Sequence, residues 1–387
     1  MSAATTTPDF ASRASRLAGL LGELEGFVAS DPANVRWLSG AAGEPHVLYG
    51  HTPLWAVVGP GGACRLVAAA ADMAWLADLV DTDEVIPYGR FVFAGDVPPR
   101  LARLATPTPL EQALAEALEA VGAGARVGVD DGMPLTVQAD LAPKLAPREL
   151  VPAAPLPIRA RSVKDEYELE RMRRANRIAE GAIVRSLSRA GVGASEHDIL
   201  RWLRTEMVEQ GARPMLGSVA FNERGALVDT VPTDRTAERG DVVRFDVGCT
   251  VEGYHSDLSR IGTIGEPDAW VRETYAALLA GEQAAIAKAA PGVRPSELYD
   301  IAVAVTRDAG LPEYDRSHCG HGIGLQIYEP PLVAPGHDEP LRAGQTLCLE
   351  TPYYVLGRAG LQVEDAVVVT ADGCERLGTA SQDLIIV

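Results

Sequence analysis

Basic residues are scarce in this chain of 387 residues. The 35 Lys and Arg stand against 53 Asp and Glu, which gives a formal net charge of −18. Nucleic acids and anionic membranes attract proteins through a basic surface, so this balance argues against both as partners. The ordinary explanation of the acidity is solubility.

Long apolar runs and paired cysteines are also missing. No run reaches the 18 or so residues that a membrane-spanning helix needs. Residues 1–16 lack the basic-then-apolar order of a secretion signal. The five cysteines are an odd number without paired spacing, as is typical of reduced cytosolic thiols and not of a disulfide frame or a zinc knuckle. We therefore expect a soluble, cytoplasmic protein.

The composition, the length and the residue patterns of the chain indicate two globular domains. Hydrophobic residues make up 47% and charged residues 23%, and the length is large for a single core. The first part alternates short β-rich runs with helical periodicity, which predicts a sheet covered by helices. Three prolines within residues 151–158 are typical of an inter-domain connector. Ser162 can cap the helix that follows it.

Four acidic residues interrupt apolar, strand-forming runs in the second part. A carboxylate buried without a partner is costly, so a core strand rarely carries one without a function. Asp246 and Asp257 flank a glycine-containing turn, and a hairpin there can bring both carboxylates side by side. Like charges that close would not both ionise unless a cation lay between them. The predicted strands are residues 242–247, 255–264, 346–354 and 361–369, and the acids are Asp246, Asp257, Glu350 and Glu364.

His321 supplies a fifth candidate ligand, in the stretch His318-Cys-Gly-His-Gly-Ile-Gly. The glycines let the backbone approach another group closely. Four carboxylates and one imidazole suit a pair of Mn²⁺, Co²⁺, Fe²⁺ or Zn²⁺ ions, which can acidify a shared water and polarise a carbonyl. Each residue alone has an ordinary explanation as a turn Asp, a salt-bridged Glu or a turn His. The set of five favours a two-metal hydrolase.

These five residues, in this order and spacing, resemble the ligands of the pita-bread metallohydrolases. That family includes methionine aminopeptidase, aminopeptidase P, prolidase and the metal-free creatinase. The stretch Asn34-Val-Arg-Trp-Leu-Ser-Gly resembles part of the N-terminal domain in the prolidase–creatinase branch, and Lys164-Asp-Glu-Tyr-Glu-Leu-Glu resembles the helix that opens the catalytic domain. The resemblance implies an α+β protein, with a creatinase-like N-terminal α/β domain (residues 1–155) followed by a pita-bread catalytic domain (residues 156–387).

The same resemblance implies roles for individual residues. Asp246, Asp257, His321, Glu350 and Glu364 would bind two divalent metal ions, with manganese favoured and Co, Zn or Fe as alternatives. Glu350 would also act as general base toward the attacking water. We therefore expect a metal-dependent hydrolase of a small amide, similar to Xaa-Pro dipeptidase or Xaa-Pro aminopeptidase.

Relatives in this branch are commonly dimers, so the resemblance also implies a homodimer. Trp37, His46 and His51 of the first domain could then reach the partner's active site. Exposed loop polarity explains these residues equally well.

Some positions depart from the family pattern. Family hydrolases have two histidines that contact the substrate, and this chain has Asp229 and Tyr328 at those positions. Prolidases have a histidine four residues before His321, where this chain has Ser317; the nearest histidine, His318, is the next residue. Asp229 replaces a donor with an anionic acceptor, which favours a cationic substrate group. Tyr328 can donate a hydrogen bond to an oxyanion but is a poor proton shuttle near neutral pH. A shifted alignment, or a variant that still cleaves Xaa-Pro peptides, is the alternative.

Two other functions stay open at this point. The departures motivate a hydrolase of a non-peptide C–N bond, of the ectoine-hydrolase or creatinase type, with a cationic substrate in specialised metabolism. The second is a binding module that keeps the fold without chemistry, and the intact ligand set argues against it.

Overall fold

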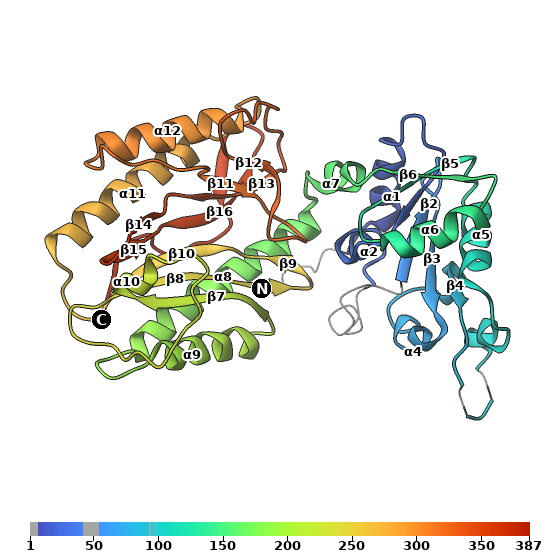
Figure 1. Ribbon diagram of the computed structural model, residues 1–387, viewed down its shortest axis with the longest axis horizontal. Coiled ribbons are helices and arrows are strands. Elements are labelled where there is room, and N and C mark those ends of the chain that lie inside the picture. The colour runs from blue at the N-terminus through green and yellow to red at the C-terminus, as the bar shows by residue number, and fades with distance from the viewer. Residues whose placement is uncertain (1–6, 42–53, 93, 97) are drawn as a thin grey trace. The chain divides into compact units, whose positions relative to one another are not determined.

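The chain folds into two compact units, residues 1–161 and 162–387 (Figure 1). The computed structural model describes residues 7–41, 54–92, 94–96 and 98–387, so His46 and His51 lie outside the described residues. The predicted domain limits, 1–155 and 156–387, stay a prediction; helix α7 (Pro155–Arg161) lies between the two division points. Within the described ranges, no helix combines the length and the apolar character needed to cross a membrane.

The first unit is a mixed α/β domain around a six-stranded sheet in the order β4-β3-β2-β1-β5-β6. Strands β1, β5 and β6 run parallel, as do β3 and β4, whereas β2 is antiparallel to both neighbours. Val28, Val57 and Val67 of this sheet share one core with helix α5, so the predicted helix-covered sheet is confirmed. Its elements are α1 (Phe10–Ala18), β1 (Phe27–Ala29), α2 (Pro32–Ser39), β2 (Leu54–Val58), β3 (Cys64–Ala69), η1 (Ala70–Asp72), α4 (Met73–Leu76), η2 (Thr82–Glu84), β4 (Val85–Tyr88), η3 (Pro99–Ala105), α5 (Leu110–Ala120), β5 (Arg126–Val129), α6 (Leu135–Lys144), β6 (Glu149–Pro152) and α7.

The proline-rich segment after this sheet is more regular than a connector. It contains the end of β6 and most of α7, because proline is compatible with strand edges and with the first turn of a helix. The predicted helix cap at Ser162 is wrong. The N-cap of α8 is Asp165, which accepts a hydrogen bond from the backbone of Glu168 while the Glu168 side chain accepts one from the backbone of Asp165.

The second unit is built on a ten-stranded sheet in the order β12-β11-β13-β16-β10-β8-β7, with β17, β18 and β9 paired to β16, β10 and β8. Helices α8 and α9 share one core with β7 and β8, and α11 and α12 share another with β13 and β16 (Figure 1). The elements are α8 (Glu166–Arg189), α9 (Glu196–Glu209), β7 (Arg213–Phe221), α10 (Asn222–Gly225), β8 (Val242–Val251), β9 (Tyr254–His255), β10 (Leu258–Thr263), α11 (Ala269–Lys288), α12 (Pro295–Asp308), β11 (Gly320–Gly322), β12 (Glu329–Leu332), β13 (Thr346–Glu350), β14 (Tyr353–Val355), β15 (Ala359–Leu361), β16 (Glu364–Val369), β17 (Cys374–Arg376) and β18 (Ile385–Ile386).

The four predicted strands of this unit are present, with different limits. The strand predicted over 346–354 divides into β13 and β14 at Thr351–Pro352, and the strand over 361–369 divides into β15 and β16. Strand β7 is absent from the prediction. Pro214 and Gly217 weaken its β-forming pattern, and its pairing with β8 is irregular between these two residues.

Candidate metal centre

A row of polar residues crosses four neighbouring strands of the large sheet. Asp246 on β8 lies opposite Ser259 on β10, and Ser259 lies opposite Glu364 on β16. Glu364 in turn lies opposite Glu350 on β13. Directly opposed residues point to the same face of a sheet. The pairing therefore gathers three predicted ligands on one face.

The other face of the same strands is apolar. Val243, Phe245 and Val247 of β8 lie in the core with α8 and α9, and Leu347 and Leu349 of β13 lie in the core with α11 and α12. Because side chains alternate along a strand, the even-numbered residues of β8 and β13 turn away from these helices. This alternation explains how buried strands carry acids without disrupting either core.

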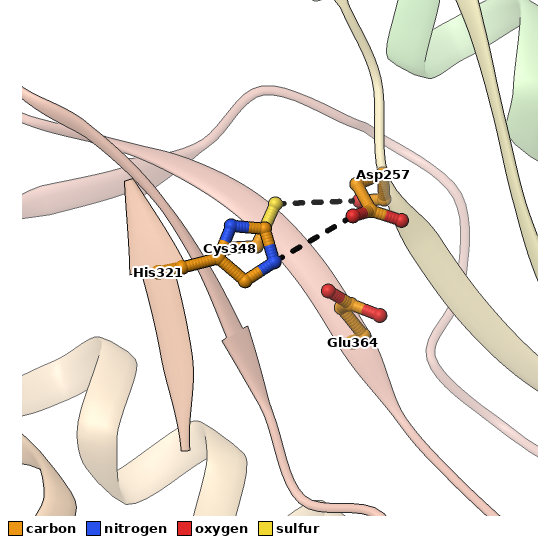
Figure 2. Close-up of side chains that lie close together, drawn as sticks. All are labelled: Asp257, His321, Cys348 and Glu364. Carbon is orange, nitrogen blue, oxygen red and sulfur yellow. Dashed lines mark hydrogen bonds and ion pairs between the residues drawn. The ribbon is translucent and has the colours of Figure 1, made fainter. Parts of the chain in front are cut away.

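Asp257 and His321 join the acidic face from neighbouring segments. The predicted hairpin is present: Glu252 and Gly253 have positive φ angles of 50° and 87° and connect β8 to β9. Asp257 follows, two residues before Ser259. Nε2 of His321 lies 3.7 Å from Oδ2 of Asp257 (Figure 2).

A hydrogen bond holds the ring of His321 in the tautomer that can bind a metal ion through Nε2. Its Nδ1 lies 2.9 Å from the carbonyl oxygen of Gly322, and we assign the ring proton to this nitrogen. The lone pair of Nε2 then faces Asp257. Burial lowers the pKa of His321, which favours the neutral imidazole that a metal ligand must be. The ring of Tyr328 stacks on it, with 3.6 Å between centroids.

The carboxylates of this face lack enough positive charge around them. Burial raises the pKa of Asp246 to about 6, against the opposing charge of Arg244. Burial, with the charges of Asp246 and Glu350, raises the pKa of Asp257 well above its usual range; burial and the charge of Asp257 do the same for Glu364. Among the described residues, Oδ1 of Asp257 has no hydrogen-bond partner. A divalent cation would satisfy such a group.

Four side chains come close enough to share one ion. Asp257, His321, Cys348 and Glu364 each offer one ligand atom, and these atoms lie within 4.8 Å of one another (Figure 2). All four residues are at most 3% exposed. Three of them are predicted ligands, whereas Cys348 is absent from the prediction. The donor set fits a divalent transition metal.

Glu350 contacts two further polar side chains. Nδ1 of His318 lies 3.2 Å from Oε1 of Glu350, without the alignment of a hydrogen bond. Gln362 donates hydrogen bonds to Oε2 of Glu350 at 3.4 Å and to Oε2 of Glu364 at 3.1 Å. Ser317 is exposed, so His318 is the residue of this pair that reaches Glu350.

Arg244 is a fully buried cation that the sequence reasoning missed. Its Nη1 donates to Oε1 of Gln362 at 2.8 Å and to Oδ2 of Asp246 at 3.3 Å. Its Nη2 donates to the carbonyl oxygen of Leu227 at 3.2 Å. The guanidinium therefore partly neutralises the first residue of the acidic row. Arg244 lies two residues before Asp246 on a predicted strand, so both side chains point to the same face of the sheet. This spacing could have identified Arg244 from the sequence.

Asp229 lines a cavity of about 340 Å³ beside the acidic row. Ser218, the β7 partner of Asp246, lines the same cavity. The charge of Asp229 contributes to the raised pKa of Asp246, so the two carboxylates interact. The cavity also contains Arg204, which gives it charges of both signs. The remaining lining residues are His197, Leu200, Leu216, Gly217, Thr230, Val231 and Pro232.

Models of two protein families match the chain. The model of metallopeptidase family M24 matches residues 170–371. The model of the creatinase/prolidase N-terminal domain matches residues 16–163. All five predicted ligands lie within the first of these matches.

Individual relatives are moderately similar. The Xaa-Pro dipeptidase of Pyrococcus horikoshii is 30% identical over 227 residues, which are 58% of this chain and 65% of that relative's length. The probable dipeptidase PepE of Mycobacterium tuberculosis is 33% identical over 268 residues, which are 69% of this chain and 71% of its own. The crystal structure of dipeptidase PepE from Mycobacterium ulcerans is 28% identical, with a TM-score of 0.79 over 97% of both chains.

Proposed function

The chain belongs to metallopeptidase family M24, with a creatinase/prolidase N-terminal domain before its pita-bread domain, and on that premise we propose that it hydrolyses Xaa-Pro dipeptides. The observation that carries the proposal is the row of acids that meets His321 on one face of the sheet, with Glu350 and Glu364 buried and Asp246 partly buried. The names of the similar dipeptidases support the substrate class.

Two divalent ions are the cofactors of the proposed enzyme. Their ligands are the five residues of the sequence prediction, and manganese is the first metal to test. Ions in this position supply the charge that acidifies a water and polarises the carbonyl of the scissile bond. The proposed ligands are Asp246, Asp257, His321, Glu350 and Glu364.

Glu350 is the proposed general base. Its carboxylate accepts a proton from the attacking water, and Gln362 holds the carboxylate in place from the other side. His318 lies beside Oε1 of Glu350 and is 20% exposed, so the proton can pass to solvent or to the leaving amine. Tyr328 is 56% exposed and stacks on His321; partial desolvation of its phenol and the charges of nearby acids raise the pKa of Tyr328. Its hydroxyl therefore keeps its proton and can donate a hydrogen bond to a developing oxyanion.

The cavity beside the acidic row suits a zwitterionic dipeptide. Asp229 and Arg204 both line it, so it offers an anion for the substrate ammonium and a cation for its carboxylate. In this proposal Asp229 binds the cationic group of the substrate. The change from histidine to aspartate at this position led us to expect this role.

Turnover of Xaa-Pro dipeptides is the first expected result. We expect the Mn²⁺-loaded protein to hydrolyse Ala-Pro or Leu-Pro, with little activity on the matched dipeptides that end in alanine. Formation of the hydrolysis products, measured over a panel of dipeptides, N-acyl amino acids and cyclic amidines, provides the comparison. Turnover of none of the Xaa-Pro peptides would reject the proposed substrate class.

Asp229→Asn is expected to raise KM for Xaa-Pro dipeptides by about tenfold or more, because a hydrogen bond to a charged group contributes roughly 1.5–3 kcal/mol. We expect kcat to change much less. Asp234→Asn is the matched control, since Asp234 is an exposed acid of the same loop that does not line the cavity. An unchanged KM in the Asp229 variant would remove Asp229 from the substrate site.

A hydrolase of a non-peptide C–N bond, of the ectoine-hydrolase or creatinase type, is the second candidate. Asp229 in the cavity favours it, because this carboxylate suits a cationic amidine as well as an ammonium. Hydrolysis of a cyclic amidine without hydrolysis of dipeptides would select this function. The homodimer and the cytoplasmic location stay predictions.

A further inference from the structure

We propose that Cys348 is a sulfur ligand of the metal ion held by Asp257, His321 and Glu364. The inference rests on the proposed metal site and adds a ligand to it. It also bears on metal identity, because a thiolate is a softer donor than the carboxylates around it.

The sheet pairing directs the side chain of Cys348 toward the proposed metal site. Cys348 lies opposite His321 across β11 and β13, and opposite Ala366 across β13 and β16. It is two residues before Glu350 on the same strand, so both side chains point to the acidic face. Figure 2 shows the sulfur beside the imidazole of His321 and the carboxylate of Asp257.

The spacing of the donor atoms is close to that of a single coordination sphere. Two ligands of a tetrahedral ion lie about 3.6 Å apart, given bonds of roughly 2.3 Å to sulfur and 2.1 Å to nitrogen. The four donor atoms lie within 4.8 Å of one another, so side-chain movements of up to about one ångström would bring them into one coordination sphere. Oδ1 of Asp257 has no hydrogen-bond partner among the residues that the structure describes, which points independently to a cation as its partner.

Within the described part of the chain, the sulfur has only a weak partner. Its polar contact is with the backbone carbonyl oxygen of Asp257, at 3.8 Å. A thiol is a weak donor and gives up little in leaving this contact. On metal binding the S–H bond breaks, the sulfur forms a bond to the ion, and the proton passes to the buffer.

A thiolate in this position shifts the metal preference. Carboxylates suit Mn²⁺, whereas sulfur and nitrogen donors suit Zn²⁺, Co²⁺ and Fe²⁺. Cys348 is fully buried, so the sulfur is shielded from solvent. We therefore expect the ion beside Cys348 to be one of these softer metals, while a second ion held only by oxygen donors can be manganese.

Cobalt reports directly on sulfur ligation, without any assay of activity. We expect the full-length protein loaded with Co²⁺ to show a sulfur-to-cobalt charge-transfer band in the near ultraviolet, together with the weaker visible bands of bound cobalt. Cys348→Ser should lose the charge-transfer band and keep the visible bands, with Co²⁺ affinity reduced by at least about tenfold, the smallest loss typical even for an outer partner of a ligand. Cys348→Ala repeats the test if the serine variant folds poorly.

Cys249→Ser is the matched control, because Cys249 is also fully buried and its sulfur already has polar partners in Ala175 and Ser256. The control should keep the charge-transfer band. Visible cobalt bands without a charge-transfer band in the wild-type protein would reject sulfur ligation and leave the metal site intact. Absence of both would reject the metal site, and a band that survives Cys348→Ser would assign the sulfur to another cysteine.

Discussion

Glu350→Gln is expected to lower kcat on the accepted substrate by roughly 10²–10⁴-fold, because an amide cannot take up the proton of the attacking water. The variant should fold, since glutamine has the same shape and its amide oxygen can accept the hydrogen bond from Gln362. Steady-state kinetics of the metal-loaded protein provide the measurement. Elemental analysis of the same sample shows whether the ions are retained.

Glu364→Gln separates ligation from proton transfer. Glu364 shares the Gln362 contact with Glu350 but is proposed only as a ligand, so its variant should lose metal affinity and recover much of its activity at high metal concentration. Glu350→Gln should keep its low kcat at any metal concentration. Full recovery of Glu350→Gln with added metal would show that Glu350 is a ligand without the role of a base.

The fold was largely predictable because its strands carry strong local patterns. The buried run that forms β2 appears in the sequence without a polar residue, whereas the start of α8 was predicted at Ser162 and lies at Asp165. Strand β7 was not predictable from its own residues. It is extended because β8 provides partners for its backbone, which overrides the effect of Pro214 and Gly217.

The candidate site was predictable where a residue conflicts with its local surroundings. An acidic residue within an apolar strand is conspicuous, and this is how Asp246 and Glu364 were identified. Cys348 does not conflict with an apolar run, since free cysteine behaves as a small hydrophobic residue. Its proposed role depends on two observations: the two-residue spacing from Glu350 is visible in the sequence, but the pairing with His321 appears only in the folded sheet.

The hydrogen bonds of Arg244 could not be predicted without the fold, because its partners come from separate segments. Gln362 and Leu227 lie far from it in the sequence, yet both accept its hydrogen bonds. A buried arginine beside Asp246 limits how much positive charge the ions must supply at that end of the row. The two ends of the site therefore differ: Asp246 has a protein cation beside it, whereas Asp257 has an oxygen without a partner in the described chain.

The shortage of positive charge around Asp257 and Glu364 gives the largest stability effect that we expect, and it appears in the metal-free protein. A carboxyl whose pKa is raised by folding binds more protons in the folded state than in the unfolded state, so stability falls as pH rises from the unfolded pKa to the folded one. For Asp246 this interval runs from 3.8 to about 6. Asp257 and Glu364 have pKa values raised well above their usual range and extend the decline to higher pH. We expect the metal-free protein to melt at a lower temperature at pH 8 than at pH 5.

Metal should reverse this trend, because the ion binds the deprotonated carboxylates and replaces their protons. At a metal concentration of 100 Kd the gain is about 2.7 kcal/mol, and it should be larger at pH 8 than at pH 5. Thermal melting curves from pH 5 to pH 8, with and without metal, measure both effects. Asp257→Asn removes one titrating group at nearly constant shape, so it should flatten the metal-free pH dependence and weaken the response to metal. If wild type and this variant showed the same pH dependence without metal, Asp257 would not be the strained carboxylate that its burial and unpartnered oxygen indicate.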